Sequence, residues 1–517
     1  MMPEIAVGNL TLLLLIPVLG AALLLLVPRR QTSTLFFLAL LATTLSFVWS
    51  LRILAAFDGS RGEMQLIERM PWMPAFGIEY IVGIDGISVF LVLLTTLLMP
   101  LAILASWPVR DKVKEYLVCM LLLETGMVGA FLALDLVLFY VFWEVMLVPM
   151  YFLIGVWGGG RRIYAAIKFV IFTMAGSLLM LVAIIYFATR HSQETQVITF
   201  DLLRLYDFRL PAHEQMWLFL AFALSFSIKV PLFPFHTWLP DAHVEAPTAG
   251  SVVLAAILLK LGTYGFLRFA LPLFPDAALA SAPYFVALAV VGIVYGAAVA
   301  MMQADIKKLV AYSSVSHLGF VMLGLFVLNV QGLQGSIYQM LSHGLSTGAL
   351  FLLVGMIYDR RHTRMIDDFG GLWKQVPVFS ALLLLVTFSS IGLPGLNGFI
   401  GEFLILLGAF AVTPGWTAVA ATGIILGAVY MLWMVRRVIF GPLTRPENQK
   451  LYDLNGRELL IMAPIVALIV IMGVYPQPFL SRMKPSIEHT LKKIFIVQSP
   501  PSAAAADKLA ESKGDER

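Results

Sequence analysis

The stretch FSIKVPLFPFHTWLPDAHVEAP, residues 226–247, places a lysine and two prolines at the end of a long apolar run. Lys229 is followed closely by Pro231 and Pro234. A charge inside an apolar helix is costly, and proline removes a backbone donor and breaks the helix. Both are tolerated only where a polar group or water satisfies them. The stretch therefore predicts an interrupted membrane helix with a buried cation beside the break.

The composition places the chain among membrane proteins. Of its 517 residues 60% are hydrophobic and only 13% are charged, with a mean hydropathy of +0.89, more apolar surface than a soluble domain could bury. The single cysteine, Cys119, excludes an internal disulfide and any cysteine-ligated metal or iron–sulfur site. A net charge of +4 gives no argument for nucleic acid as a partner.

Apolar runs long enough to cross about 30 Å of hydrocarbon recur along the whole chain. Backbone groups in lipid must be paired within their own segment, so we expect about fourteen transmembrane helices and an all-α polytopic fold. The first is a retained span at Leu10–Val27, because no basic residue precedes it as in a secretory signal. The other clear runs cover residues 33–51, 82–106, 115–134, 136–157, 163–188, 215–235, 248–271, 283–303, 308–329, 335–358, 377–412, 416–440 and 458–475.

Two blocks of five spans, at about 115–271 and 283–439, are related in their order. The fourth span of each is interrupted, by KVPLFPF in the first block and by IGLPGLNGFIGEF (391–403) in the second. Because five is odd, the second copy must cross the membrane upside down. The pattern predicts two inverted five-helix repeats. We expect five segments, at 1–110, 111–275 (first repeat), 276–441 (second repeat), 442–480 (last span) and 481–517 (an amphipathic and disordered tail).

The basic residues sort to one face of the predicted bundle. By the positive-inside rule this face is cytoplasmic, which puts both termini on the periplasmic side of a bacterial inner membrane. The tail is an exception that predicts an interfacial amphipathic helix or a contact with another chain at 482–496. The residues that define the basic face are Arg29, Arg30, Arg110, Lys112, Lys114, Arg161, Arg162, Lys307, Lys308, Arg360, Arg361, Arg364, Arg436 and Arg437.

A few ionisable side chains lie in the middle of the predicted spans. Each charge at that depth costs roughly 2.5–3.5 kcal/mol on insertion scales, so these groups must pair or meet water. The alternative interpretation is a structural role, as ion pairs or hydrogen-bonded histidines. For Glu144, Lys229 and Lys260, depth in the membrane excludes snorkelling to the interface. No spacing of His, Asp or Glu resembles a metal site. The candidate residues are Glu144, Lys229, Lys260, His317, His343 and Glu402.

At these residues the chain closely resembles the chain-M branch of the antiporter-like membrane subunits of proton-pumping NADH–quinone oxidoreductase, respiratory complex I. The resemblance covers nearly all of 80–475. The GEF ending at Glu402 is the discriminating feature, because the sister chains L and N carry lysine there. The motifs are IKVPLFPFHTWLPDAHVEAPTAGSVVLAAILLKLGTYG, LPGLNGFIGEFLIL, FWEVMLVPMY and YSSVSHLGF.

The resemblance implies a proton relay within a membrane-arm subunit. Glu144 and Lys229 would form an ion pair at the cytoplasmic half-channel, and Lys260 would be the central relay. His317 and His343 would lie on the hydrated axis, with Glu402 as the exit group. This chain would bind no cofactor, because FMN, iron–sulfur clusters and quinone belong to partner subunits. Its partners would be other membrane-arm subunits, including the sister antiporter-like chains.

Three alternatives stay open at the level of sequence. The long motif is shared by subunits of multi-chain sodium/proton antiporters, and a membrane-bound hydrogenase complex is a related option. A scaffold without transport is disfavoured by the row of intramembrane charges. Glu402 favours complex I among these readings.

Overall fold

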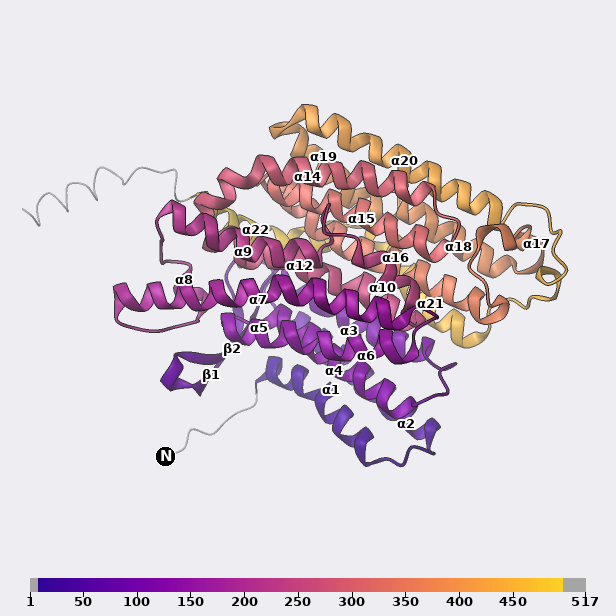
Figure 1. The fold of residues 1–517 in the computed structure, drawn as a ribbon, viewed down its shortest axis with the longest axis horizontal. Helices are drawn as coiled ribbons and strands as arrows, with labels where there is room; N and C mark the ends of the chain where they lie inside the picture. Colours follow the sequence, from indigo (N-terminus) through magenta and orange to yellow (C-terminus); the bar gives the residue numbers. More distant parts are fainter. Residues whose placement is uncertain (1–7, 496–517) are drawn as a thin grey trace, which may run out of the picture.

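The computed structural model describes residues 8–495, which form a bundle of long helices with one small β-hairpin at its edge (Figure 1). Within this part of the chain twelve helical segments are long and apolar enough to cross a membrane. They are α1 (Asn9–Leu26), α2 (Thr32–Ala56), α3 (Ser88–Ala105), α4 (Val113–Leu132), α5 with α6 (Leu136–Val145 and Leu147–Trp157), α7 (Arg162–Thr195), the continuous run α11 to α13 (Thr248–Leu273), α14 (Pro275–Met301), α15 (Ile306–Phe326), α16 (Val330–Arg361), α20 (Pro414–Val438) and α21 (Gly456–Val474).

Two further crossings are each divided into two short helices. The first consists of α9 (Ala212–Lys229) and α10 (Trp238–Glu245), and the second of α18 (Pro377–Ser390) and α19 (Asn397–Val412). Together with the twelve continuous segments they make up the predicted fourteen crossings. Both breaks fall where proline and glycine predicted them, in the fourth span of each repeat.

The two divided crossings run in opposite directions. The helix α9 begins beside Arg190 near the C-terminal end of α7, where Glu214 accepts a hydrogen bond from that arginine at 2.9 Å. The helix α18 begins at the opposite end of the bundle, where the backbone N–H of Phe379 donates to Asp453 just before α21. This antiparallel arrangement is the predicted inversion of the repeats, while the residue boundaries of the five segments stay a prediction.

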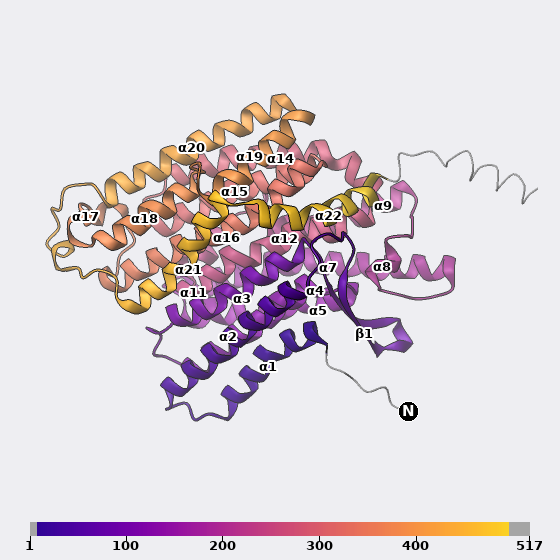
Figure 2. The same ribbon diagram turned by 180° about the vertical axis from the view of Figure 1, so that it is seen from behind.

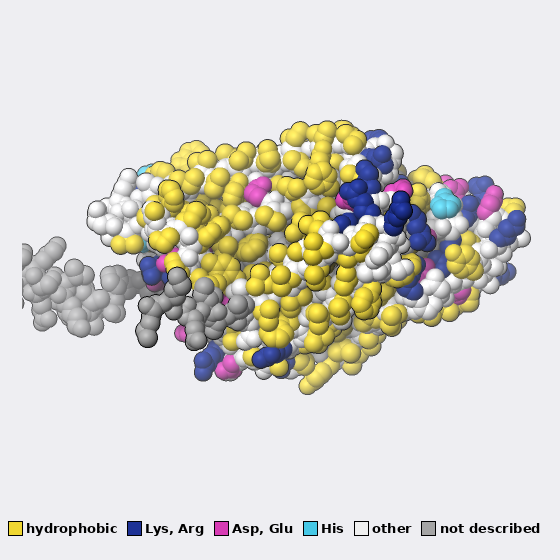
Figure 3. Space-filling view, turned by 90° about the horizontal axis from the view of Figure 1, so that it is seen from below, with side chains coloured by type: hydrophobic (Ala, Val, Ile, Leu, Met, Phe, Trp, Pro, Cys, Tyr) yellow, Lys and Arg dark blue, Asp and Glu magenta, His cyan; other side chains and the backbone are white. Residues whose placement is uncertain are grey.

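One end of the bundle, called the basic end below, carries the basic residues that the sequence assigned to one face, and dark blue side chains gather there in Figure 3. Lys114 Nζ donates to the carbonyl of Val27 at 2.8 Å, which joins the start of α4 to the end of α1. Arg364 donates to the carbonyl of Val244 at 2.8 Å, which joins the segment after α16 to α10. The helix ends that carry these residues therefore form one surface.

The opposite end, called the hairpin end, carries a β-hairpin that the sequence analysis missed. The strands β1 (Gln65–Met73) and β2 (Ile78–Ile84) pair antiparallel, and Gly77 takes the left-handed conformation (φ 69°) at the turn. The span predicted at 82–106 was therefore wrong at its start, since α3 begins only at Ser88. Its first residues are apolar because they are buried in a strand, and hydropathy does not separate the two cases.

The amphipathic helix predicted at 482–496 is α22 (Gln477–Phe495), which lies across the hairpin end and contacts α16, α14 and α13 (Figure 2). Ser486 Oγ accepts a hydrogen bond from the backbone N–H of Gly86 at 3.0 Å. Gln334 of α16 donates to the carbonyl of Leu480 at 2.9 Å. This helix therefore links the two repeats. The tail predicted to be disordered lies, beyond Phe495, outside the described residues.

Close packing around Gly262 makes a test of the fold. A Cβ at this position would lie 2.8 Å from the carbonyl oxygen of Phe226 and 2.9 Å from the backbone nitrogen of Val230, so α9 and α12 (Leu259–Gly265) approach only because the residue is glycine. We expect Gly262→Ala to cost about 1–3 kcal/mol of stability through overpacking. Thermal unfolding in detergent measures this loss. The matched control is Gly155→Ala, where the new Cβ meets only Ala166 at 3.6 Å. Equal melting of the two variants would contradict the packing.

Candidate functional site

Lys229 is the last residue of α9 and lies just before the break. Its side chain is 1% exposed, and Nζ has no hydrogen-bond partner among residues 8–495. The ammonium instead faces the indole ring of Trp143, with Nζ 5.0 Å from the ring centroid. A ring face attracts a cation, and more strongly when both are desolvated. The break therefore ends with a buried cation in a partly aromatic setting.

The backbone groups released by the break are satisfied from within the protein. The indole N–H of Trp238, on α10, donates to the carbonyl of Ile228 at 2.8 Å. The N–H of Leu232 donates to the carbonyl of Ser227 at the same distance, 2.8 Å. The prolines interrupt the helix and free two backbone carbonyls, which accept hydrogen bonds from the Trp238 indole and from the backbone N–H of Leu232. The sequence predicted that polar groups would satisfy the break.

Glu144 lies on α5, two residues before the helical irregularity at Met146 that separates α5 from α6. Its Oε1 is buried and has no hydrogen-bond partner in the described part of the chain. Glu144 and Lys229 share a neighbourhood, because Trp143, the residue before the glutamate, lies under the lysine. The direct ion pair that the resemblance implied is not formed in this structure, since the ammonium faces the indole and has no hydrogen-bond partner among the described residues.

Lys260 lies in α12 at the centre of the bundle and is fully buried. Its Nζ donates to the carbonyl of Ala255 at 2.6 Å and to His343 Nδ1 at 2.6 Å. Ala255 belongs to a π-helical turn, Leu254–Leu258, directly before α12. A π-turn shifts the regular hydrogen bonds by one residue, so the backbone itself supplies a partner for this lysine.

Two histidines continue the row from Lys260 into the second repeat. His343, on α16, and His317, on α15, have ring centroids 5.6 Å apart. His317 Nδ1 lies 2.8 Å from Glu402 Oε1 on α19, and the same oxygen accepts a hydrogen bond from Gln339 at 3.0 Å. The structure thus brings together Lys260, both histidines and Glu402 as one connected row.

A small cavity lies along this row. Its lining includes His317, His343, Ser342, Ser389 and Ser390, and the space admits about one water molecule. The hydroxyl of Ser390 lies 3.4 Å from His317 Nε2, and His343 Nε2 has no partner among the described residues. Water in this cavity would have polar partners, which a proton-conducting chain needs across the gap between the two rings.

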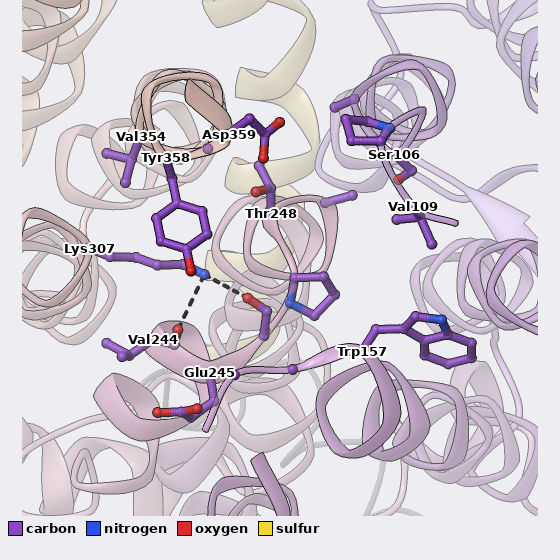
Figure 4. A pocket seen from close by; sticks show the side chains of 18 of the residues that line it. Ser106, Val109, Trp157, Val244, Glu245, Thr248, Lys307, Val354, Tyr358 and Asp359 are labelled. Carbon is purple, nitrogen blue, oxygen red and sulfur yellow. Dashed lines mark hydrogen bonds between the residues drawn. The ribbon is translucent and has the colours of Figure 1, made fainter. Parts of the chain in front are cut away.

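A larger cavity of about 310 Å³ opens at the basic end between α6, α10, α15 and α16. Figure 4 shows Lys307 extending into it beside Tyr358, above Val244 and Glu245. Lys307 Nζ donates to the carbonyl of Ala246 at 2.6 Å. This cavity, called the vestibule below, was not predicted from the sequence. Lys307 was predicted only as part of the basic face, and Glu245 was not predicted as a site residue.

His243 was also missed as a site residue. It is fully buried and stacks on Phe351 with ring centroids 4.8 Å apart, and neither ring nitrogen has a hydrogen-bond partner within residues 8–495. The carbonyl of the next residue, Val244, lies 3.5 Å from Lys307 Nζ. In the sequence His243 is the second histidine of HTWLPDAH, beside the predicted break. It was not predicted as a site residue because the histidines there were considered only as metal ligands.

A second buried charge pair lies toward the hairpin end. Arg268 Nη2 donates to Asp85 Oδ1 at 2.7 Å, and both side chains are less than 5% exposed. Asp85 also accepts from the backbone N–H groups of Ile87 and Ser88, at the start of α3. The hydroxyl of Ser88 is a fourth donor to the same carboxylate. Because four donors compensate its charge, this aspartate has a structural role.

Comparisons with known proteins show the family of this chain. Residues 133–427 match the family model described as NADH:quinone oxidoreductase/Mrp antiporter, membrane part. The chain belongs to this family. It is 49% identical over 462 residues to NADH-quinone oxidoreductase subunit M of Rhodobacter capsulatus, covering 88% of this chain and 90% of the relative. It is 46% identical to NADH-ubiquinone oxidoreductase chain 4 of Arabidopsis thaliana, covering 94% and 97%.

Solved structures of several membrane complexes share the fold. A chain of respiratory complex I from Thermus thermophilus superimposes with a TM-score of 0.85 at 35% identity, covering 94% of this chain and 99% of that chain. A chain of an archaeal membrane-bound sulfane sulfur reductase gives 0.81 at 26% identity, covering 91% and 76%. A chain of the Mrp complex of a Dietzia species gives 0.79 at 22% identity, covering 98% and 59%, and shows the fold alone.

The Trp238 hydrogen bond makes a test of how the break is stabilised. Trp238→Phe removes the indole N–H and leaves the buried Ile228 carbonyl without its partner, which we expect to cost about 1–3 kcal/mol. Thermal unfolding of the purified protein in detergent measures the change. Trp217→Phe is the control, because Trp217 is 73% exposed. An unchanged melting temperature for Trp238→Phe would show that the break does not depend on this bond.

Proposed function

We propose that this chain is a proton-translocating, non-redox subunit in the membrane arm of NADH:quinone oxidoreductase. The observation that carries the proposal is the connected row of buried ionisable side chains from Lys260 through His343 and His317 to Glu402. A charge at this depth is costly, so a row of such groups indicates a path for an ion. All of them can bind and release a proton.

The vestibule at the basic end supports proton uptake from that side. Lys307 and Glu245 line this vestibule, and His243 lies two residues before Glu245 on α10. In the proposed cycle the pair Glu144–Lys229 opens and closes. When the pair closes, the carboxylate favours the charged lysine, and when it opens the lysine gives its proton onward.

Transfer then proceeds from the first repeat into the second. Lys229 passes its proton through water to Lys260, which hydrogen-bonds His343 directly. From there the proton crosses the small water-sized cavity to His317 and reaches Glu402. Glu402 lies on the early part of α19, the half-helix that runs toward the hairpin end, so release occurs on that side.

The remaining assignments follow from the proposed complex. NADH oxidation, FMN, iron–sulfur clusters and quinone belong to partner subunits, and quinone reduction there sends an electrostatic signal along the membrane arm to the pair Glu144–Lys229. The basic end faces the bacterial cytoplasm and both termini face the periplasm. The antiporter alternative is weaker, because the likeness to an Mrp chain is one of fold at 22% identity.

Lys260→Met tests the central relay. The substitution keeps an apolar side chain of similar length but removes the proton-binding amine, so we expect proton pumping to fall by on the order of 100-fold. The measurement is dye-reported acidification of proteoliposomes that contain the whole complex, normalised to NADH oxidation. Lys374→Met, an exposed lysine at the basic end, is the matched control. Wild-type pumping in an assembled Lys260→Met complex would refute the relay.

Glu402→Gln separates charge from structure at the end of the row. Glutamine can keep contacts to Gln339 and His317 but carries no acidic proton. We therefore expect the complex to assemble and to melt at the wild-type temperature, while its pumping falls about as far as in Lys260→Met. Loss of assembly in Glu402→Gln, with pumping retained by the remaining complex, would instead assign this residue a structural role.

A further inference from the structure

A groove on the side of the bundle, at the basic end, has the shape and charge of a lipid site. Its cavity of about 460 Å³ opens between α1, α4 and α6, and both α1 and α6 contact α4, which forms the floor. We propose that this groove binds one anionic phospholipid, with its phosphate at Arg29 and Lys112 and an acyl chain over Val118, Cys119 and Phe152. Nothing in the proton relay requires this site, so the two proposals stand independently.

The lower part of the groove is apolar and open to the bilayer. Leu25 of α1, Val118 and Cys119 of α4, and Phe152 and Val156 of α6 line it. Phe152 is 44% exposed on this surface of the bundle. Side chains of this kind at membrane depth are covered by lipid or by another chain, and a groove between helix ridges accommodates an acyl chain better than a flat surface does.

The rim of the groove carries an excess of positive charge. Arg29, Lys112 and Lys114 line it together with a single carboxylate, that of Glu115. Arg29 lies 2.5 Å from Glu115, and Lys114 donates to the carbonyls at the end of α1. Lys112 is exposed and has no ion pair in the part of the chain that the structure describes. The rim thus has cationic donors left over for an anion.

An anionic phospholipid satisfies both parts of the groove at once. Its phosphate lies at the depth of the interfacial basic residues, and its acyl chain lies below, where the groove is apolar. Inorganic phosphate would leave the apolar floor uncovered, and an acidic protein segment would put charge beside Phe152. A zwitterionic headgroup would bring its own cation next to Lys112. Charge and apolar surface together therefore select an anionic lipid.

Photo-cross-linking in the whole complex tests the site. The probe is phosphatidylglycerol with a diazirine in its acyl chain, added to the detergent-purified complex, and mass spectrometry locates the labelled peptides. We expect labelling of the peptides that contain Val118–Cys119 and Phe152, displaced by unlabelled phosphatidylglycerol and not by phosphatidylcholine. Lys112→Gln alone should weaken labelling several-fold, and Arg29→Gln with Lys112→Gln on the order of tenfold. Arg30→Gln, in the same loop but outside the lining, should leave labelling unchanged.

A second variant tests the acyl part without touching the charges. Cys119→Phe places a ring on the groove floor, and we expect it to abolish labelling at Phe152 while all three rim cations remain. Equal labelling by a phosphatidylcholine probe, or unchanged labelling in Lys112→Gln and in the double variant, would overturn the proposal. So would an unlabelled groove in a complex whose other lipid-facing helices are labelled, because another chain would then cover it.

Discussion

Hydrocarbon offers no hydrogen-bond partner, and the arrangement of this protein follows from that constraint. Every backbone group and every charge within the bundle must be satisfied by the chain itself or by water that the chain admits. The continuous helices meet the requirement within each segment. The divided helices meet it with side chains such as Trp238, whose indole binds a carbonyl freed by the break. Charged residues are tolerated where such irregular backbone brings polar groups together.

Four of the six ionisable side chains predicted from the sequence coincide with irregular helix geometry. Glu144 lies just before the turn that divides α5 from α6, and Lys229 ends α9 at the first break. Lys260 follows a π-helical turn, whose Ala255 carbonyl binds it. Glu402 follows the second break. Each irregularity shifts backbone partners away from the regular ladder, so it supplies polarity at the depth where a charged group needs it.

The inverted repeats bring ionisable residues to the centre of the bundle from both of its ends. The first repeat contributes a broken helix that arrives from the hairpin end, and the second contributes one that arrives from the basic end. Their breaks bring Lys229 and Glu402 to the middle of the bundle from opposite sides. Between them, unbroken helices α15 and α16 carry His317 and His343 on facing surfaces. Ionisable side chains thus lie at the centre of the bundle on helices that enter it from both ends.

The sequence by itself determined the membrane class, the number of crossings, the two breaks and six of the buried ionisable residues, because hydropathy and proline act locally along the chain. The tertiary structure alone decided which of those charges touch. It placed His317 against Glu402, turned the Lys229 ammonium toward an indole, and opened a vestibule around Lys307. Contacts between residues far apart in sequence depend on how helices pack. The periodicity of one helix does not determine how the neighbouring helix is rotated about its own axis.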